Sequence, residues 1–331
     1  MANKLPSFTK YLIPAIILVA LGAFYLFPKP KNSSLPLITI TQIIDHHTLD
    51  EVRNGMIEAL AIQGLKDGET VQIIYENANG NVSIANEIAK KFQTLKPAVI
   101  VALSTQSAQT LLAIARASHT PLVFTAVTDP VAAKLVSAYD QTKDGVTGIS
   151  DYMPVGPQLS MILAFVPSLK KLGVLYNPAE VNSVSILKQM ERIAETHGIE
   201  LVYAAANNTS EVTAATKSLI GKVEAIYFPN DNTVMAAAAA VSNTASQEKI
   251  PVFANDSASV KSGVLAAVAY DRKAMGSKTA SIIAGLLAGK TTADFPVTHD
   301  VPQKVVMNSE TQKLLGIAIP PAYQAKIHLV Q

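Results

Sequence analysis

Short apolar segments alternate with longer amphipathic segments along most of this chain, in two successive sets. The expected strands are residues 37–44, 71–75, 98–103 and 121–126, then 171–176, 200–205, 225–228, 251–254 and 264–269. The expected helices are residues 47–63, 83–94, 104–117 and 131–136, then 182–196, 209–220, 233–248, 257–261 and 273–287. Strands that alternate with helices form parallel sheets covered by helices. The sequence therefore predicts an α/β protein with two parallel-sheet lobes.

Length and composition agree with two folded lobes. The chain has 331 residues, of which 49% are hydrophobic and 16% charged, and it contains no cysteine. This length corresponds to about two domains, and the composition excludes a disordered chain. The lack of cysteine excludes a disulfide scaffold, a cysteine-based metal site and a cysteine nucleophile. Residues 1–35 hold four lysines and no acid, so the rest carries 23 basic against 25 acidic side chains. Such a near-neutral body argues against nucleic-acid binding.

The N-terminal segment predicts export. Residues 11–27 form a run of 17 residues without a charge, preceded by Lys4 and Lys10. This run is long for a signal peptide and just long enough for a spanning helix. No clean Ala-x-Ala cleavage site follows it. We therefore expect residues 1–35 to be a signal peptide or a membrane anchor with a linker. An uncleaved helix that tethers a periplasmic protein to the inner membrane is favoured over secretion after cleavage.

Short polar side chains follow most of the expected strands. In open parallel sheets, ligands bind beyond the carboxyl ends of the strands, where such side chains would meet. Helix N-termini at the same ends suit a carboxylate or another small anion. Helix capping alone is the alternative, because the same residue types cap any helix that follows a strand. The candidate ligand-binding residues are Asp45, His46, Ser104, Thr105, Thr125, Thr128, Asp129, Asn177, Asn230, Asp231, Asn232 and Asp256.

Catalytic signals are weak in this sequence. It has no glycine-rich phosphate loop, no HExxH motif and no G-x-S-x-G motif. His46 and His47 are adjacent, and neighbouring residues on a chain rarely face the same metal. We therefore expect binding without turnover, and no catalytic residue, metal or cofactor.

Several segments carry a family resemblance. They are Gln42-Ile-Ile-Asp-His46, Leu49-Asp-Glu-Val-Arg53, Phe124-Thr-Ala-Val-Thr-Asp-Pro130, Gly173-Val-Leu-Tyr-Asn177, Phe228-Pro-Asn-Asp-Asn-Thr-Val234 and Ile250-Pro-Val-Phe-Ala-Asn-Asp256. In this order, from about residue 37 to residue 290, they resemble the ABC transporter substrate-binding family that includes tryptophan and tyrosine uptake proteins. The chain departs from that family in three places. It lacks the lipoprotein cysteine of many relatives, His47 stands where a proline is common, and Asn177-Pro-Ala-Glu180 replaces a glycine-containing loop.

The resemblance implies a fold and a role. The fold would be two Rossmann-like lobes of the type I periplasmic-binding kind, joined by three crossovers. We expect lobe 1 at residues 36–148 and 268–294, and lobe 2 at residues 149–267 and 295–331. The role would be an extracytoplasmic solute-binding receptor of an ABC importer, with no enzymatic activity. Its partners would be a small solute and a membrane permease driven by an ATPase.

The ligand implied by the resemblance is a small zwitterion such as an aromatic amino acid. By similarity to type I amino-acid receptors, its carboxylate would be held by Ser104, Thr105, Thr125 and Thr128. A buried ammonium needs an anionic partner. Asp231 and Asp256 are the first candidates, ahead of Asp129 and Asp45. An aromatic ligand side chain would stack on Tyr152, Tyr176 or Phe228.

Three other functions remain as alternatives. The first is a ligand sensor that signals to a membrane partner without transport. The second is a transcription regulator of similar fold, which is disfavoured because residues 1–35 are apolar where a DNA-binding module should be. The third is an enzyme, which lacks any nucleophile–base set.

Overall fold

The computed structural model describes residues 35–142 and 144–331, and residues Pro36–Gln331 form one compact unit. The apolar helix expected at residues 11–27 lies outside the described residues. Among the helices that the structure does describe, none has the length and apolarity to cross a membrane.

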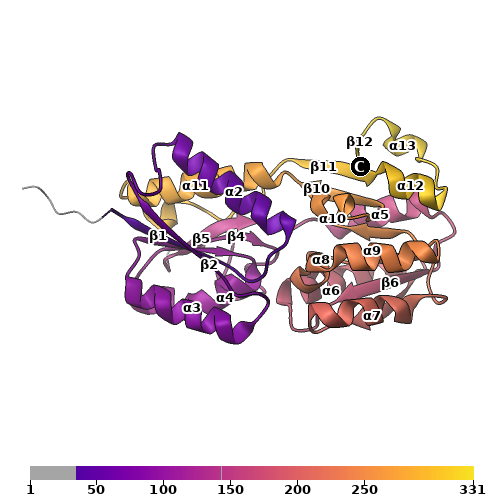
Figure 1. Cartoon of the computed structure of the whole chain (residues 1–331), viewed down its shortest axis with the longest axis horizontal. Helices are drawn as coiled ribbons and strands as arrows, with labels where there is room; N and C mark the ends of the chain where they lie inside the picture. The colour runs from indigo at the N-terminus through magenta and orange to yellow at the C-terminus, as the bar shows by residue number, and fades with distance from the viewer. Residues whose placement is uncertain (1–34, 143) are drawn as a thin grey trace, which may run out of the picture. The chain divides into compact units, whose positions relative to one another are not determined.

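The first lobe is built on a five-stranded parallel sheet (Figure 1). Its strand order is β2-β1-β3-β4-β5, so β1 lies inside the sheet and the chain winds outward in both directions. The strands are β1 (Leu37–Gln42), β2 (Gln72–Asn77), β3 (Val99–Leu103), β4 (Leu122–Val127) and β5 (Val146–Ser150). The helices are α2 (His47–Ile62), α3 (Val82–Leu95), α4 (Thr105–Ser118) and α11 (Arg272–Leu287).

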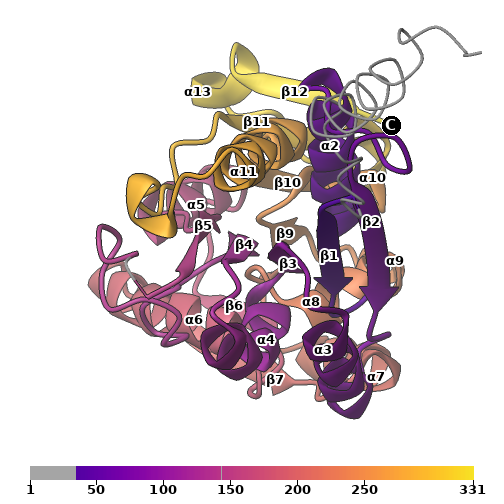
Figure 2. The same ribbon diagram turned by 90° about the vertical axis from the view of Figure 1, so that its left-hand side faces the viewer.

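Helix α11 reaches the first lobe from far along the chain and packs on α2. Figure 2 shows the two helices from the end of this lobe. Glycines allow the close approach: a Cβ atom on Gly276 would lie 2.3 Å from the carbonyl oxygen of Val52, and one on Gly55 would lie 2.9 Å from Cα of Lys273. Any larger residue would push the helices apart, so this glycine pair positions the N-terminus of α11.

The second lobe is built on a seven-stranded sheet of order β12-β11-β10-β9-β8-β6-β7. All neighbouring strands are parallel except β10 and β11. The strands are β6 (Lys171–Tyr176), β7 (Glu200–Ala205), β8 (Ala225–Tyr227), β9 (Val252–Ala254), β10 (Ala266–Tyr270), β11 (Gln303–Asn308) and β12 (Ile327–Val330). The helices are α5 (Val155–Phe165), α6 (Val181–Thr196), η1 (Thr209–Glu211), α7 (Val212–Leu219), α8 (Asn232–Ala236), α9 (Ala238–Gln247), α10 (Ser257–Lys261), α12 (Ser309–Leu315) and α13 (Pro321–Gln324).

The chain crosses between the two sheets three times within the described residues. It leaves the first sheet after β5, returns after β10 to form α11, and enters the second sheet again at β11. Before that last crossing, the 3-10 helix η2 (Thr292–Asp294) is followed by a β-bridge between Thr298 and Ile149 of β5. This confirms the α/β architecture with two lobes expected from the sequence.

Some local predictions were wrong. The helix expected at residues 131–136 is a set of turns, because Lys134 adopts the left-handed conformation (φ 59°) and ends the first turn. The helix expected at residues 233–248 is interrupted at Ala237 and forms α8 and α9. Strand β5, helix α5 and the elements from β11 onward were not predicted. In β5, Gly148 weakens the strand pattern, yet a Cβ there would lie 2.0 Å from the carbonyl oxygen of Phe124.

Candidate functional site

An inner cavity lies where the two lobes face each other. Its walls come from the carboxyl ends of strands and the first turns of helices, as expected for open parallel sheets. It is lined by His46, Thr48, Leu49, Thr105, Ala126, Thr128, Asp151, Asn182, Asn230, Asn232, Met235 and Arg272. Its volume is about 10 Å³, which is the room that a single water molecule needs. A larger molecule can enter only if the lobes or the lining side chains move.

An outer cavity of about 300 Å³ adjoins the inner one and shares His46, Thr48 and Met235 with it. On the side of the first lobe, its lining includes Asp45, His47 and Asp50 at the start of α2. On the other side it is lined by small residues of the second lobe, namely Ala236, Ala238, Ala239, Ala258, Ser259 and Ser262. These three shared residues therefore lie between the small inner cavity and the wider outer cavity.

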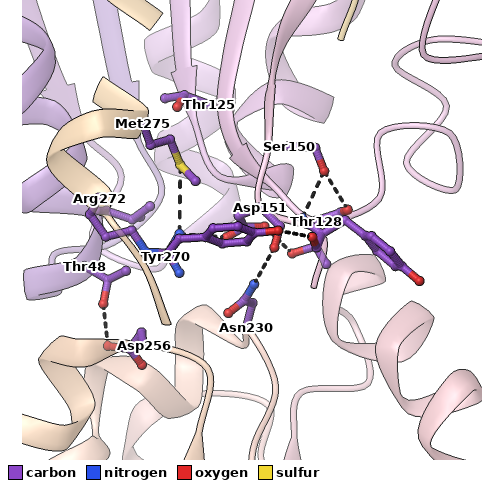
Figure 3. A network of polar contacts seen from close by, with 12 residues as sticks. Thr48, Thr125, Thr128, Ser150, Asp151, Asn230, Asp256, Tyr270, Arg272 and Met275 are labelled. Carbon is purple, nitrogen blue, oxygen red and sulfur yellow. Dashed lines mark hydrogen bonds and ion pairs between the residues drawn. The ribbon is translucent and has the colours of Figure 1, made fainter. Parts of the chain in front are cut away.

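A buried ion pair marks the crossovers between the lobes. Nη1 of Arg272 lies 3.0 Å from Oδ2 of Asp151, and the two side chains are 1% and 5% exposed (Figure 3). Thr128 donates its hydroxyl to the other carboxylate oxygen of Asp151 at 2.8 Å. Nε and Nη2 of Arg272 are buried and have no hydrogen-bond partner within the described part of the chain. A buried donor without a partner is energetically costly. Arg272 lines the inner cavity, so its unpaired donors can bind an acceptor that enters there.

Two buried acids lie on the second lobe. The carboxylate of Glu180 accepts hydrogen bonds from the side chain of Asn182 and from the backbone and side chains of Asn232 and Thr233, at 2.7–3.0 Å. Asp231 accepts from the backbone N–H groups of Asn177 (2.6 Å) and Val234 (3.0 Å). Burial, and then the charge of Glu180, raise the pKa of Asp231 to about 8. Among the described residues, no lysine or arginine forms an ion pair with either acid.

Two asparagine side chains present acceptors to the inner cavity. The amide nitrogen of Asn182 donates to Glu180 at 2.9 Å and to the carbonyl oxygen of Asn230 at 2.6 Å. The amide nitrogen of Asn230 donates to the carbonyl oxygen of Asp151 at 3.4 Å. The side-chain oxygens of Asn182 and Asn230 are buried and have no partner in residues 35–142 and 144–331. Both residues line the inner cavity, so both oxygens are available to a donor there.

Side-chain hydrogen bonds connect the lobes, together with an exposed ion pair between Lys261 and Glu51. His46, the N-cap of α2, accepts from the backbone N–H of Leu49 through Nδ1, and its Nε2 lies 3.3 Å from Oδ1 of Asn232. Thr48 donates to Asp256 at 2.7 Å, and Ser185 donates to Asp129 at 2.6 Å.

The same contacts define the state of His46. A neutral ring that donates through Nε2 and accepts through Nδ1 satisfies both of them. Burial lowers the pKa of His46, against the opposing effects of the Asn232 hydrogen bond and the charge of Asp256. His46 is therefore neutral between the lobes.

Two non-glycine residues are strained where the strands of the first lobe end. Ser104, between β3 and α4, has φ 85° and ψ 162°, and Ala126 in β4 has φ 54°. The pairing of β4 with β5 shifts register between Thr125 and Val127. Residues other than glycine rarely adopt such backbone conformations, and backbone strain of this kind concentrates at functional sites. Ala126 and Thr105, the residue after Ser104, both line the inner cavity, and the hydroxyl of Thr105 is buried without a partner among the described residues.

The structure brings some of the sequence-predicted residues together and separates others. His46, Thr105, Thr128, Asn230 and Asn232 line the inner cavity, and Asp45 lines the outer one. Of the residues that the structure describes, Ser104, Thr125, Asp129, Asn177, Asp231 and Asp256 line neither cavity.

Each residue outside the cavities has its own contacts. The hydroxyl of Thr125 accepts from Thr279 at 2.9 Å, and the side chain of Asn177 donates to Thr233 and to the carbonyl oxygen of Asn207. Asp231 and Asp256 cap α8 and α10. Oδ2 of Asp256 remains buried without a partner in the described part of the chain.

The three aromatic candidates lie elsewhere. Tyr152 donates to Gln189, Tyr176 packs edge-on against Tyr203, and Phe228 is fully buried in the core of the second lobe. In the described structure, none of these three lines the inner cavity.

Sequence reasoning missed seven residues that line the inner cavity: Thr48, Leu49, Ala126, Asp151, Asn182, Met235 and Arg272. Asp151 follows β5, a strand that was not predicted. Arg272 is the second residue after β10 and the first residue of α11, but a long cationic side chain there differs from the short polar side chains expected at strand ends. The described residues contain no group of three or more His, Cys, Asp or Glu side chains that could hold a metal ion.

Comparison with known proteins gives one consistent family. The model of the ABC transporter substrate binding protein family matches residues 37–326. A tyrosine-binding protein from Clostridioides difficile is 36% identical over 289 residues, which cover 87% of this chain and 82% of that protein.

Two solved structures are informative about conformation. The ABC domain from Streptococcus pneumoniae in complex with L-Trp is 30% identical, covers 90% of this chain and 100% of its own, and superposes with a TM-score of 0.85. The ligand-free, open structure of a substrate-binding protein with adhesive properties from Clostridium difficile is 34% identical at 90% and 99% coverage, with a TM-score of 0.67. At similar identity and coverage, the present structure superposes better on the L-Trp complex than on the open, ligand-free structure.

Proposed function

This chain belongs to the ABC transporter substrate-binding protein family, and from that premise we propose that it binds an aromatic amino acid between its lobes. Proteins of this family are the solute receptors of ABC transporters, and those of importers work outside the cytoplasm. The alternative role of a sensor without transport is not favoured by these comparisons. The tyrosine-binding relative and the L-Trp complex support the proposed ligand class.

The observation that carries this proposal is the pattern of unused polar atoms around one cavity. Nε and Nη2 of Arg272 are donors, and the side-chain oxygens of Asn182 and Asn230 are acceptors, all buried without partners among the described residues. A carboxylate fits the guanidinium, whose planar donors match its two oxygens. An ammonium group has only donors and fits the two amide oxygens. An α-amino acid carries both groups.

The remaining lining supports a ligand with an apolar part. Leu49, Ala126 and Met235 supply the apolar surface of the inner cavity. The hydroxyl of Thr105 joins Arg272 as a candidate for the carboxylate, in keeping with the role expected for it by resemblance. Thr128 acts on the ligand through Asp151, to which its hydroxyl is donated.

Ligand entry requires the lobes to separate. The inner cavity of about 10 Å³ is too small for an amino acid. The contacts His46–Asn232, Thr48–Asp256 and Ser185–Asp129 join the lobes and would break on opening. The higher similarity to the L-Trp complex than to the open relative supports hinge closure around the ligand.

As a member of this family, the protein would act with a permease in the membrane, and we propose that an ATPase drives this permease. Residues 11–27 would tether the protein to the inner membrane as an uncleaved helix. Alkaline phosphatase fused after Gln331 should be active if residues 36–331 are exported. The intact mass of the purified protein distinguishes the tethered form from the cleaved one.

A ligand screen tests the proposed function. The full-length chain, in mild detergent because residues 11–27 are apolar, would be heated with each amino acid in turn, and with glucose as a control. A ligand at 100 times its Kd stabilises the folded protein by about 2.7 kcal/mol, which raises Tm by several degrees. L-Tyrosine or L-tryptophan should give the largest rise. A larger rise with glucose, or no rise with either aromatic amino acid, would contradict the proposal.

A further inference from the structure

Glu180 carries a buried carboxylate that touches neither cavity, yet it holds two of the side chains that do. It is 0% exposed and is the N-cap residue of α6. We propose that Glu180 is a positioning residue that makes the site specific for a protonated amine, an inference that rests on the proposed function. It does so by fixing the orientation of two asparagine amides and by placing a negative charge behind them.

Glu180 fixes the orientation of the Asn182 side-chain amide. An asparagine amide can be turned so that either its oxygen or its nitrogen faces a ligand, and a carboxylate can only accept hydrogen bonds. Glu180 therefore holds the nitrogen, at 2.9 Å, and the second hydrogen goes to the carbonyl oxygen of Asn230 at 2.6 Å. With both hydrogens used, Asn182 presents only its oxygen to the inner cavity. That oxygen accepts from an ammonium group and repels a second carboxylate.

Asn232 connects Glu180 to the other lobe through hydrogen bonds. Its amide nitrogen donates to Glu180 at 2.7 Å, so its oxygen is turned toward Nε2 of His46 at 3.3 Å. His46 can then act as a donor through Nε2 while Nδ1 accepts from Leu49. Glu180 thus determines the orientation of one amide that faces the ligand and of one that joins the lobes.

Glu180 also places a buried negative charge behind the Asn182 amide. Glu180 accepts five hydrogen bonds from Asn182, Asn232 and Thr233. No cationic side chain among the described residues pairs with it. A ligand ammonium on the oxygen of Asn182 would bring the missing positive charge to within two hydrogen bonds of Glu180. A charge at that range is felt strongly in a buried site.

Helix capping alone does not account for this arrangement. The backbone N–H groups of Asn232 and Thr233 at the start of α8 donate to Glu180, as to any cap. The side chains of Asn182 and Asn232 donate to it as well, although neither amide is part of the helix backbone. These two contacts are the ones that face the ligand and the other lobe.

The test uses Glu180→Gln in the full-length chain. Glutamine places an NH2 group where one carboxylate oxygen accepted, so an amide must turn over or lose its bond. The probes are L-tyrosine and 3-(4-hydroxyphenyl)propionate, which lacks only the ammonium group; if the wild type prefers L-tryptophan, that ligand and indole-3-propionate replace them. By calorimetric titration, L-tyrosine should bind about 30-fold more weakly or worse. The deaminated probe should change by less than about threefold.

The matched control is Glu211→Gln. Glu211 also accepts from asparagine amides, those of Asn207 and Asn208, but it is partly exposed and lines neither cavity of the described structure. Both probes should bind this variant as they bind the wild type. If Glu180→Gln does not fold, Asn182→Leu removes the same acceptor and leaves the backbone contacts of Glu180 in place. It should weaken L-tyrosine about tenfold or more and spare the deaminated probe.

The outcomes separate two failures. If the wild type binds L-tyrosine and Glu180→Gln weakens both probes equally, Glu180 has only a structural role and the inference is wrong. The same holds if L-tyrosine binds the variant as well as the wild type. If the wild type binds neither aromatic amino acid, the proposed function itself fails and the inference fails with it.

Discussion

Two buried charged clusters flank the inner cavity, and they differ in how their charge is balanced. At the crossovers, Asp151 and Arg272 form an ion pair at 3.0 Å, and the pair leaves guanidinium donors over. In the second lobe, the carboxylate of Glu180 accepts from amides and a hydroxyl, and no cation pairs with it in the described residues. The first cluster offers spare donors, and the second turns spare acceptors toward the cavity.

This difference shows how one cavity can offer both hydrogen-bond donors and hydrogen-bond acceptors to a ligand. A guanidinium with unpaired N–H groups attracts an anion. A carboxylate that accepts hydrogen bonds from the amide nitrogens leaves the amide oxygens free to accept from a cation. A zwitterion would satisfy the donors and the acceptors at once. On the proposed function, Arg272 and Glu180 therefore act together in ligand recognition, and each substitution below removes or alters one side chain that takes part.

The largest effect is expected from Arg272→Met. The substitution removes the carboxylate donors and leaves Asp151 buried without its cation. Breaking a buried pair in this way costs about 3–5 kcal/mol of unfolding free energy, and binding of an aromatic amino acid should weaken by about 100-fold or more. Urea unfolding and calorimetric titration measure the two effects.

Two companion variants separate the effects of Arg272. Lys273→Met removes an exposed neighbouring cation and should change neither property. The double variant Asp151→Asn/Arg272→Met should recover stability but not binding. If the double variant regained binding, Arg272 would not be the carboxylate partner.

A smaller effect is expected when His46 becomes protonated. Its lowered pKa in the closed arrangement means that opening lets the ring take up a proton below about pH 6.5, its ordinary value. Binding is then fully supported above that pH and is lost as the pH falls through it. The charges that face His46 are Asp256 and Glu180, which favour protonation, and Arg272, which opposes it. Affinity should fall about tenfold from pH 7 to pH 5.

His46→Asn is the variant that checks this pH dependence. Asparagine caps a helix N-terminus well but does not titrate, so the loss of affinity between these pH values should largely disappear. An unchanged pH profile in His46→Asn would rule out His46 as the titrating group.

Asp256→Asn should have a still smaller effect on binding. Asp256 joins the lobes through Thr48, and its second oxygen is buried without a partner among the described residues. Asparagine can keep both the cap of α10 and the bond from Thr48, so the substitution removes mainly a negative charge beside His46. We expect affinity to fall between about threefold and tenfold. A loss above about 30-fold would instead identify Asp256 as the direct partner of the ammonium group.

Asp231→Asn should have the smallest effect on affinity, below about twofold, because Asp231 lines neither cavity of the described structure. The main effect of Asp231→Asn should instead be on the pH dependence of the free energy of unfolding. The folded pKa is raised to about 8 from a value of 3.8, so the folded state holds a proton that the unfolded chain has lost, and stability falls as the pH rises between these values. Denaturation at about pH 6 and pH 9 should show this loss in the wild type and less of it in Asp231→Asn.

The sequence was sufficient for the two-lobed architecture and for some of the residues that line the inner cavity. Strand-end polar residues such as Thr105 and Asn230 were found because the carboxyl ends of parallel strands face the same cleft. The same rule also selected Asp231, because a cap that points along its own helix has the same sequence signature as one that points into the cleft. Which way a carboxylate points is decided by its neighbours in space.

Arg272 shows the limit of this kind of prediction. A charged first residue of a long helix is typical of a solvated surface, and only the packing of α11 on α2 buries it beside Asp151. Glu180 was part of a loop recognised as unusual, but its role depends on Asn232, which is 52 residues away in the sequence. Contacts between distant segments are what a single sequence does not contain.

The most direct test of the account compares three ligands on the wild-type chain by calorimetric titration. L-Tyrosine carries both charged groups, tyramine lacks the carboxylate, and 3-(4-hydroxyphenyl)propionate lacks the ammonium group; their L-tryptophan equivalents serve if that amino acid binds more tightly. If the cavity is built for a zwitterion, each single-charge analogue should bind at least about 100-fold more weakly than the amino acid, since each leaves one end of the site unsatisfied. Binding of either analogue within about threefold of the amino acid would contradict the account, because the corresponding cluster would then contribute nothing to recognition.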